Sequence, residues 1–183
     1  MQDKIILGIL QFGKLTAYDI KKTIEGSTAY FYNASMGSIH PALKKLEAAE
    51  YVNAEHKVEN GRAKKIYEIT ATGRDVFAHW LGEGLPLGKF KDETLVRLFF
   101  FGNVSAEAQV RHISEHIAVL DKQIKALEVI KHGVDAMDIP EHLKQHALFQ
   151  RATLDFGLNY FRFAKGWYQD FLATELAAER PAS

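Results

Sequence analysis

Hydrophobic residues recur every three or four positions through most of the chain, which is the spacing of one face of an α-helix. In the first fifty residues this pattern predicts three short helices, over 3–12, 16–26 and 35–50. Thr16 is placed to cap the second helix, and Asp19 three residues later would complete a short capping box. We therefore expect a small helical domain in this part of the chain.

After residue 50 the helical spacing is replaced by two strand-like runs, over 51–58 and 63–70. Between them lies Asn60-Gly61, a dipeptide that hairpin turns prefer. The turn and the returning strand are basic, with Arg62, Lys64 and Lys65. Three short helices followed by a basic hairpin predict a winged helix-turn-helix. In that fold the third helix reads the DNA major groove and the hairpin, or wing, contacts phosphates or an adjacent groove.

The predicted third helix has two unlike faces. Ile39, Leu43 and Leu46 share one face and are predicted to point into the core. The opposite face is small near its start and cationic further on, and it carries Gly37, Ser38, Pro41, Lys44 and Lys45. A helix lying deep in a major groove needs little bulk, hydroxyls and lysines. We expect phosphate contacts from Lys44 and Lys45, and base-edge contacts from Ser38 and His40.

The start of the third helix, the role of its cationic face and the partner of the winged helix each have an alternative interpretation. Ser35 is the expected N-cap of the third helix, but Pro41 would kink the first turns, and a helix that starts near Pro41 is the structural alternative. The cationic face alone also fits an ordinary amphipathic helix with a solvated lysine pair. The basic hairpin favours DNA binding over that interpretation, and a winged helix that binds only protein is the remaining alternative.

Thr72 is expected to begin a fourth helix, with Asp75 at its capping-box position. Glycine and proline in residues 82–88 then predict a linker, which divides the chain into a domain over 1–81 and a second over 89–178. The second domain is predicted to be all helical, with a short helix over 92–101 and long helices over 105–131 and 141–178. Gly133 is the expected stop of the first long helix. The fold class is thus mainly α.

The long helices predict a dimerisation domain. One of them carries a heptad seam, and the other is apolar on more than one side, so we expect a partner subunit to cover them. The residues assigned to the dimer interface are Val110, Ile113, Ile117, Leu120, Ile124, Leu127, Leu158 and Phe161. A twofold dimer would place two recognition helices about one helical turn apart on a palindromic operator.

An aromatic side of the last helix has two interpretations. It carries Phe156, Tyr160, Phe163 and Trp167. These side chains could line a pocket for a small effector, or they could pack as plain core or dimer interface.

Composition narrows the function class. The chain has no cysteine, so disulfides and thiolate metal sites are excluded, and a cytoplasmic location is expected. His112 with His116, and His142 with His146, have helical spacing, but no third ligand is fixed and no metal is predicted. No catalytic or cofactor motif is present, so neither an enzyme nor a cofactor is expected. No stretch is apolar enough to span a membrane.

The net charge is zero, with +2 over residues 1–81 and −2 over residues 82–183. Any DNA binding would therefore depend on a local cationic face, with little nonspecific affinity.

Several runs of residues make the chain resemble a known family. They lie at 6–10, 16–20, 37–47, 65–74 and 90–93. The chain resembles the PadR family of bacterial transcriptional regulators. The resemblance is to the branch with a long helical C-terminal domain, which includes phenolic-acid repressors and a vibrio virulence activator. The sequence departs from the family pattern at His40, where tyrosine usually precedes the proline.

The resemblance implies a role for several residues. It implies that Tyr18, Ser35, Ser38, Lys44 and the wing residues Arg62, Lys64 and Lys65 lie at the DNA surface. It also implies that the C-terminal helices form a homodimer and that a small aromatic ligand releases the DNA. It does not identify the ligand or the operator.

Overall fold

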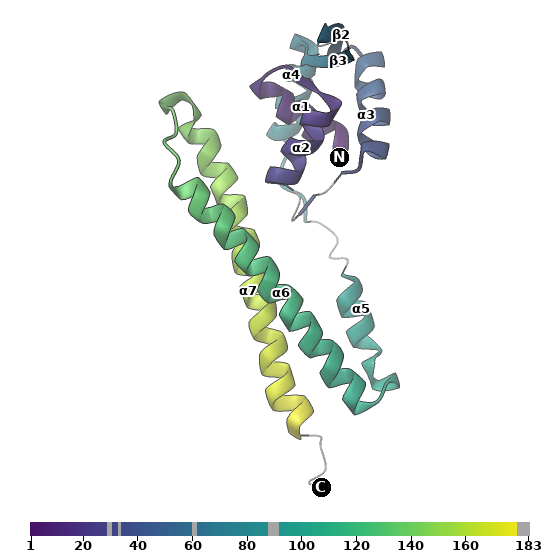
Figure 1. Ribbon diagram of the computed structural model, residues 1–183, viewed down its shortest axis with the longest axis vertical. Coiled ribbons are helices and arrows are strands. Elements are labelled where there is room, and N and C mark those ends of the chain that lie inside the picture. The colour runs from purple at the N-terminus through teal and green to yellow at the C-terminus, as the bar shows by residue number, and fades with distance from the viewer. Residues whose placement is uncertain (29–30, 33, 60–61, 88–91, 179–183) are drawn as a thin grey trace. The chain divides into compact units, whose positions relative to one another are not determined.

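The computed structural model describes residues 1–28, 31–32, 34–59, 62–87 and 92–178. It forms two compact units, Met1–Gly88 and Lys89–Ser183, which are described separately below. Figure 1 shows a first unit of short helices with a small sheet and a second unit of helices alone. The mainly α fold class is thus confirmed.

The first unit has the element order of a winged helix-turn-helix. Helix α1 (Gln2–Ile9) continues into a 3-10 turn, strand β1 (Leu15–Thr16) follows, and then come α2 (Ala17–Ser27) and α3 (Met36–Ala48). The hairpin of β2 (Val52–Glu59) and β3 (Arg62–Ile69) leads to α4 (Ala71–Gly82). The three strands are antiparallel in the order β1-β3-β2. Sequence patterning missed β1, which pairs Leu15 with Tyr67.

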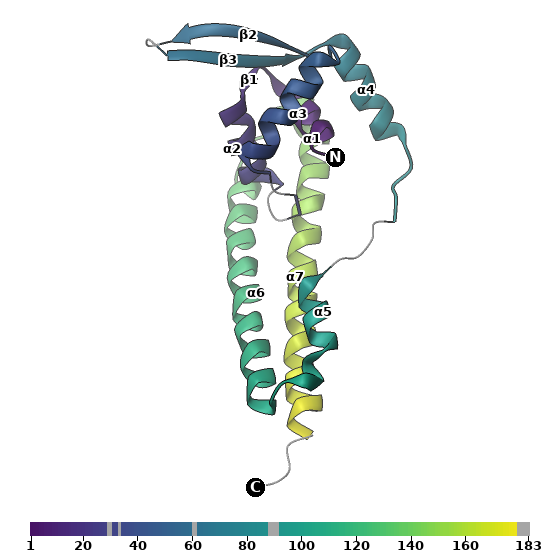
Figure 2. The same cartoon turned by 90° about the vertical axis from the view of Figure 1, so that its right-hand side faces the viewer.

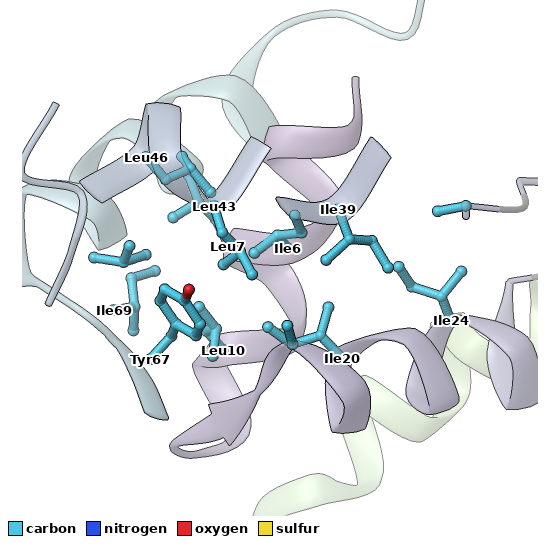
Figure 3. Close-up of a cluster of buried hydrophobic side chains, with 13 residues drawn as sticks. Ile6, Leu7, Leu10, Ile20, Ile24, Ile39, Leu43, Leu46, Tyr67 and Ile69 are labelled. Atoms are coloured by element: carbon cyan, nitrogen blue, oxygen red, sulfur yellow. The ribbon is translucent and has the colours of Figure 1, made fainter. Parts of the chain in front are cut away.

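The core of the first unit joins every helix to the sheet. Ile6, Ile20, Ile39 and Leu43 are fully buried where α1, α2 and α3 meet (Figure 3). Tyr67 and other residues of the hairpin base close the core from the sheet side. The inward face predicted for α3 is thereby confirmed, so its opposite face is free to meet a partner.

A capping box fixes the start of α2, and a C-terminal turn fixes the end of α3. Thr16 and Asp19 form the predicted capping box: the Thr16 hydroxyl accepts from the Asp19 backbone N–H, and the Asp19 carboxylate accepts from the Thr16 N–H. Helix α3 ends in a Schellman motif. Tyr51 N–H donates to the Leu46 carbonyl and Glu50 N–H to the Glu47 carbonyl, with Glu50 in the left-handed region at φ 58°.

Helix α4 begins two residues before the position expected from sequence. Its N-cap is Thr70, whose hydroxyl accepts from Gly73 N–H at 3.0 Å, rather than Thr72. The same hydroxyl donates to the Glu50 carbonyl at 2.8 Å, and Thr70 N–H donates to the Tyr51 carbonyl at 3.0 Å. Thr70 therefore ties the end of α3, the start of β2 and the start of α4 together.

The second unit is built on two long antiparallel helices, α6 (Ala106–Asp135) and α7 (Lys144–Ala178), which lie side by side (Figure 2). A short helix, α5 (Glu93–Phe99), precedes them and is capped by the Asp92 carboxylate. Helix α6 runs through Gly133, the expected stop. A single glycine costs a helix only about 1 kcal/mol, and Asp135 is held in place by ion pairs with Lys131 and Arg151.

The heptad seam lies inside one chain, which corrects its assignment to a dimer interface. Five of the eight assigned residues are buried within this chain, at 2–7% exposure: Ile113, Leu120, Ile124, Leu127 and Leu158. Val110, Ile117 and Phe161 are partly buried, and the last two pack against the same cluster. These side chains pack α6 against α7, because the two helices of an antiparallel pair can bury one heptad seam between them. The five buried side chains are therefore covered within this chain and leave no surface for a partner subunit.

Ion pairs bridge α6 and α7 beside this seam. Lys165 binds Asp121 at 2.5 Å, Arg162 binds Glu128 at 2.7 Å, and Lys131 binds Asp155 at 2.8 Å. Arg151 pairs with Asp135 at the end near the turn. In the part of the chain that the structure describes, no helix is long and apolar enough to cross a membrane.

Candidate nucleic-acid interface

The outer face of α3 carries the residues that sequence patterning assigned to DNA. Gly37, His40, Pro41, Lys44 and Lys45 are exposed. Helix α3 is continuous from Met36 to Ala48, so the alternative start near Pro41 is wrong. Because the opposite side of this helix is fully buried, the exposed face is held rigidly by the core rather than by its own contacts.

Two hydroxyls lie at the start of this face. Ser35 occupies the predicted N-cap position, but its side chain makes no capping hydrogen bond. The Ser38 hydroxyl, which is half-buried, donates to the Ser35 carbonyl at 2.9 Å. It also accepts a hydrogen bond from the Ser35 hydroxyl at 3.4 Å, so one lone pair of Ser38 remains to accept a hydrogen bond from a base edge.

The lysine pair supplies positive charge further along α3. Within the described residues, neither Lys44 nor Lys45 forms an ion pair with a carboxylate. An exposed ammonium without such a partner can neutralise a phosphate without first breaking an ion pair. The two lysines are thus suited to backbone contacts.

A groove brings together residues from α2, α3 and β3. Its volume is about 410 Å³, and its lining includes Tyr18, Asp19, His40, Lys64, Lys65 and Tyr67. Four of these, Tyr18, His40, Lys64 and Lys65, were assigned to DNA from sequence. Ser35, Lys44 and Lys45 lie outside the groove lining. The winged fold thereby gathers these four assigned side chains, of which Tyr18 and Lys65 are 47 positions apart in the sequence.

The first turn of α2 adds an acidic group to this groove. The hydrogen bond from the Thr16 hydroxyl, at 2.7 Å, lowers the pKa of Asp19, and the charges of Lys64 and Lys22 act in the same direction. Asp19 is therefore fully ionised at neutral pH. Its carboxylate accepts the capping hydrogen bond from the Thr16 N–H and lies near the positive charge of Lys64.

The register of the wing identifies a residue that sequence patterning missed. Lys57 on β2 lies directly opposite Lys64 on β3, so two lysines form a cross-strand pair. Like charges placed directly opposite cost a hairpin about 0.2–1 kcal/mol, and a phosphate between them would remove that repulsion. Asn60 and Gly61, where the sequence predicts the turn, lie outside the described residues. The side chain of Arg62 lies outside the described residues.

Lys65 differs from the other wing lysines. Its ammonium lies 2.8 Å from the Glu47 carboxylate of α3 and 5.5 Å from the centre of the Tyr67 ring. The hydrogen bond to Glu47 raises the pKa of Lys65. Burial raises the pKa of the Tyr67 phenol, so this ring is neutral beneath the ammonium.

The aromatic residues assigned to an effector lie on an exposed side of α7. Their exposed fractions are 72% for Phe156, 37% for Tyr160, 71% for Phe163 and 42% for Trp167. They line neither the groove described above nor a hollow of about 570 Å³ beside the turn between α6 and α7. The second unit alone thus presents them as a surface rather than as a pocket.

The histidine pairs of the second unit form no metal centre in the described part of the chain. His112 lies 3.1 Å from Glu115, and the rings of His116 and Tyr168 meet edge to face with centroids 4.8 Å apart. Burial lowers the pKa of His116. His116 therefore packs α6 against α7 through Tyr168.

Comparison with known proteins covers both units. Residues 6–79 match the transcriptional regulator PadR-like family, and residues 90–174 match the virulence activator alpha C-term family. The negative transcriptional regulator PadR of Bacillus subtilis (strain 168) is 29% identical over 104 residues, which are 56% of this chain and 57% of that protein. The match therefore spans little more than half the length of that relative.

Solved structures share the whole fold. Bacillus subtilis PadR in complex with operator DNA has a TM-score of 0.80 at 22% identity, covering 93% of this chain and 96% of that one. The same protein in complex with p-coumaric acid has a TM-score of 0.74 at 22% identity, with the same coverage of both chains, 93% and 96%. At this identity the likeness shows the fold.

Two further structures are similar over nearly the full chain. The Vibrio cholerae virulence activator AphA has a TM-score of 0.77 at 25% identity, covering 98% of this chain and 100% of that one. For smu.1604c from Streptococcus mutans UA159 the TM-score is 0.78 at 29% identity, covering 94% and 98%. The two matched regions span both compact units: residues 6–79 carry a domain of the transcriptional regulator PadR-like family, and residues 90–174 carry one of the virulence activator alpha C-term family.

Proposed function

We propose that this protein is a sequence-specific DNA-binding repressor that binds a palindromic operator as a homodimer. The observation that carries the proposal is the outer face of α3, which is small at its start, cationic further on and held on a fully buried inner face. The basic wing beside it adds a second positive surface. A rigid helix of this kind fits a major groove, and the wing fits the adjoining backbone.

The proposal gives each residue a distinct task. Lys44, Lys45 and Lys64 contact phosphates, which fixes the position of the protein but carries little sequence information. Ser38 and His40 contact base edges. His40 stands where relatives usually have tyrosine, and an imidazole can donate and accept hydrogen bonds, so it would support a base preference particular to this chain.

The dimer is proposed to form through the outward aromatic side of α7. Phe149, Phe156 and Phe163 recur every seven residues and are each exposed by 65–72%. Tyr160 and Trp167 follow Phe156 and Phe163 by four residues, and positions four apart are neighbours on a helix surface, so they widen the same stripe. Single-chain proteins rarely expose a contiguous apolar surface of this length. A second copy, which carries the same stripe, would bury it under twofold symmetry.

Release by a small aromatic ligand is the finer part of the proposal. Bacillus subtilis PadR, which shares this fold, has been solved with operator DNA and with p-coumaric acid. In this chain Phe156, Tyr160, Phe163 and Trp167 lie on the stripe that the second copy would cover, so such a ligand would stack on these rings at the edge of the interface between the two copies. Titration of p-coumaric acid into the protein–DNA complex tests this part. The proposal expects the fluorescence anisotropy of the labelled DNA to fall as the DNA is released, while the protein remains a dimer. An unchanged anisotropy would contradict release by this ligand.

The DNA-binding face is tested by removing its lysine pair. Lys44→Ala with Lys45→Ala should weaken binding to every duplex and flatten the salt dependence. The slope of log affinity against log salt falls by about 0.9 for each phosphate that the protein no longer neutralises. The charge-matched control is Lys122→Ala with Lys144→Ala, two exposed lysines of the second unit.

Fluorescence anisotropy across a salt series measures both variants. Equal slopes for wild type and the α3 variant would show that the docking face is wrong. A fall in slope for the control variant as well would show that the effect reflects net charge rather than this face. Absence of DNA binding by the wild type would favour a winged helix that binds only protein.

A further inference from the structure

Lys65, on the wing, has a charge that is engaged by residues of α3 and β3. Its Nζ lies 2.8 Å from Glu47 Oε2, and these two residues are 18 positions apart in the sequence. The ammonium also stands 5.5 Å from the centre of the Tyr67 ring, within the range of a cation–π contact. The Lys65 side chain is 34% exposed and that of Glu47 is 37% exposed, so water only partly screens the pair.

Strand geometry separates Lys65 from its neighbour Lys64. Side chains alternate between the two faces of a strand, so Lys65 shares a face with Tyr67 and Ile69, whereas Lys64 lies on the other face. Tyr67 and Ile69 are both buried in the core of the first unit. Lys65 therefore continues the inward face of the wing toward its tip, just beyond the point where apolar packing ends.

Glu47 lies on the side of α3 that meets the wing. It is seven residues after His40, so the two share one stripe of the helix, and His40 lines the groove together with Lys64 and Lys65. An unpaired carboxylate on this stripe would repel the phosphates of bound DNA. The ammonium of Lys65 cancels that charge and at the same time joins α3 to β3.

We infer that Lys65 is a positioning residue, which clamps the wing to the recognition helix through Glu47 and Tyr67 and does not itself contact phosphate. This inference rests on the proposed DNA-binding function and corrects the expectation that all three wing cations touch DNA. A fixed angle between α3 and the wing lets one duplex satisfy both surfaces together. The clamp therefore contributes to discrimination between operator and other DNA.

The test compares four variants with the wild type. Lys65→Met and Glu47→Gln each break the clamp, and the exchanged pair Glu47→Lys with Lys65→Glu restores it with reversed charges. Lys64→Met is the matched control, since it removes a neighbouring lysine from the opposite strand face. Anisotropy with a duplex from upstream of the protein's own gene and with a scrambled duplex gives the affinity ratio and the salt slope. Hydrogen exchange of the β2 and β3 amides in the free protein measures how firmly the wing is held in the absence of DNA.

A positioning role predicts a distinct set of results. Lys65→Met and Glu47→Gln should each lower the ratio of native to scrambled affinity by up to about five-fold, the effect of a partly exposed ion pair. The salt slope should stay that of the wild type, and wing amides should exchange faster. The exchanged pair should recover the ratio to within about two-fold. Lys64→Met should instead lower the slope by about 0.9 and weaken both duplexes alike.

Two results would overturn the clamp. One is a fall in slope of about 0.9 for Lys65→Met that the exchanged pair does not recover, because that pattern belongs to a phosphate contact. The other is an unchanged affinity ratio together with unchanged amide exchange in Lys65→Met. If the wild type bound both duplexes equally, the proposed function would fail, and unchanged wing exchange in Lys65→Met and Glu47→Gln would then overturn the clamp separately.

Discussion

Gly73 marks the closest approach of α4 to the base of the wing, and its replacement by alanine should destabilise the first unit. A Cβ at this position would lie 2.1 Å from the carbonyl oxygen of Tyr51 and 2.9 Å from Cγ1 of Ile69. The first of these neighbours is backbone, so it cannot turn away as a side chain would. The Tyr51 carbonyl also accepts the Thr70 N–H at 3.0 Å, which any shift would stretch.

The expected change in the free energy of unfolding follows from effects of opposite sign. Alanine is favoured over glycine in a helix by at most about 1 kcal/mol. Forcing one carbon into a packed site costs about 1–3 kcal/mol, and weakening the Thr70 hydrogen bond costs about 0.5–1.5 kcal/mol. The expected result for Gly73→Ala is a loss of about 2 kcal/mol in the free energy of unfolding. Gly26→Ala in α2 is the control, since its Cβ meets nothing within 4 Å and should stabilise the unit by about 0.5–1 kcal/mol.

Urea unfolding followed by tryptophan fluorescence measures both variants. Trp80 lies in α4 and Trp167 in α7, so a Trp167→Phe background confines the signal to the first unit. The reasoning is refuted if Gly73→Ala unfolds at the same or higher urea concentration than the parent. It is also refuted if both alanine variants shift the midpoint in the same direction.

Three further variants test other parts of the structure. Glu50→Gly should raise the urea midpoint by an amount equivalent to about 0.5–1 kcal/mol, because glycine adopts the left-handed conformation without strain; a lower midpoint would contradict this. Burial lowers the pKa of His116, so the stability that this group contributes is complete above pH 6.5 and is lost as the pH falls through the folded-state pKa. His116→Phe should therefore lose less stability than the wild type between pH 7.5 and 5.5 in urea unfolding, whereas equal losses would refute this origin. Phe156→Ser with Phe163→Ser should convert the proposed dimer to monomer in sedimentation velocity, and an unchanged mass would move the interface elsewhere.

Much of the first unit could be predicted because its signals are local. Capping chemistry at Thr16 and the inward stripe of α3 each specify structure within a few residues. Strand β1 could not be predicted, since two residues are too few to show a period and its pairing depends on Tyr67 far along the chain. The start of α4 was misplaced because two threonines stand two positions apart, and tertiary hydrogen bonds to Glu50 and Tyr51 select Thr70.

The candidate site shows the same division. Sequence patterning identified the exposed residues of α3 because amphipathicity alone separates them from the core. It missed Lys57, whose position opposite Lys64 follows from hairpin register, and it could not separate Lys65 from Lys64 without the contact to Glu47. It also assigned the heptad seam to a partner, because apolar spacing does not say whether the second helix comes from the same chain.

The central claim is that α3 and the wing bind a particular DNA sequence. The most direct measurement is fluorescence anisotropy of the purified protein with DNA from upstream of its own gene and with a scrambled duplex of equal length, across a salt series. Tight binding to the native duplex, weak binding to the scrambled one, and a steep fall with salt are the predicted results. No binding to either duplex at any salt concentration would contradict the account.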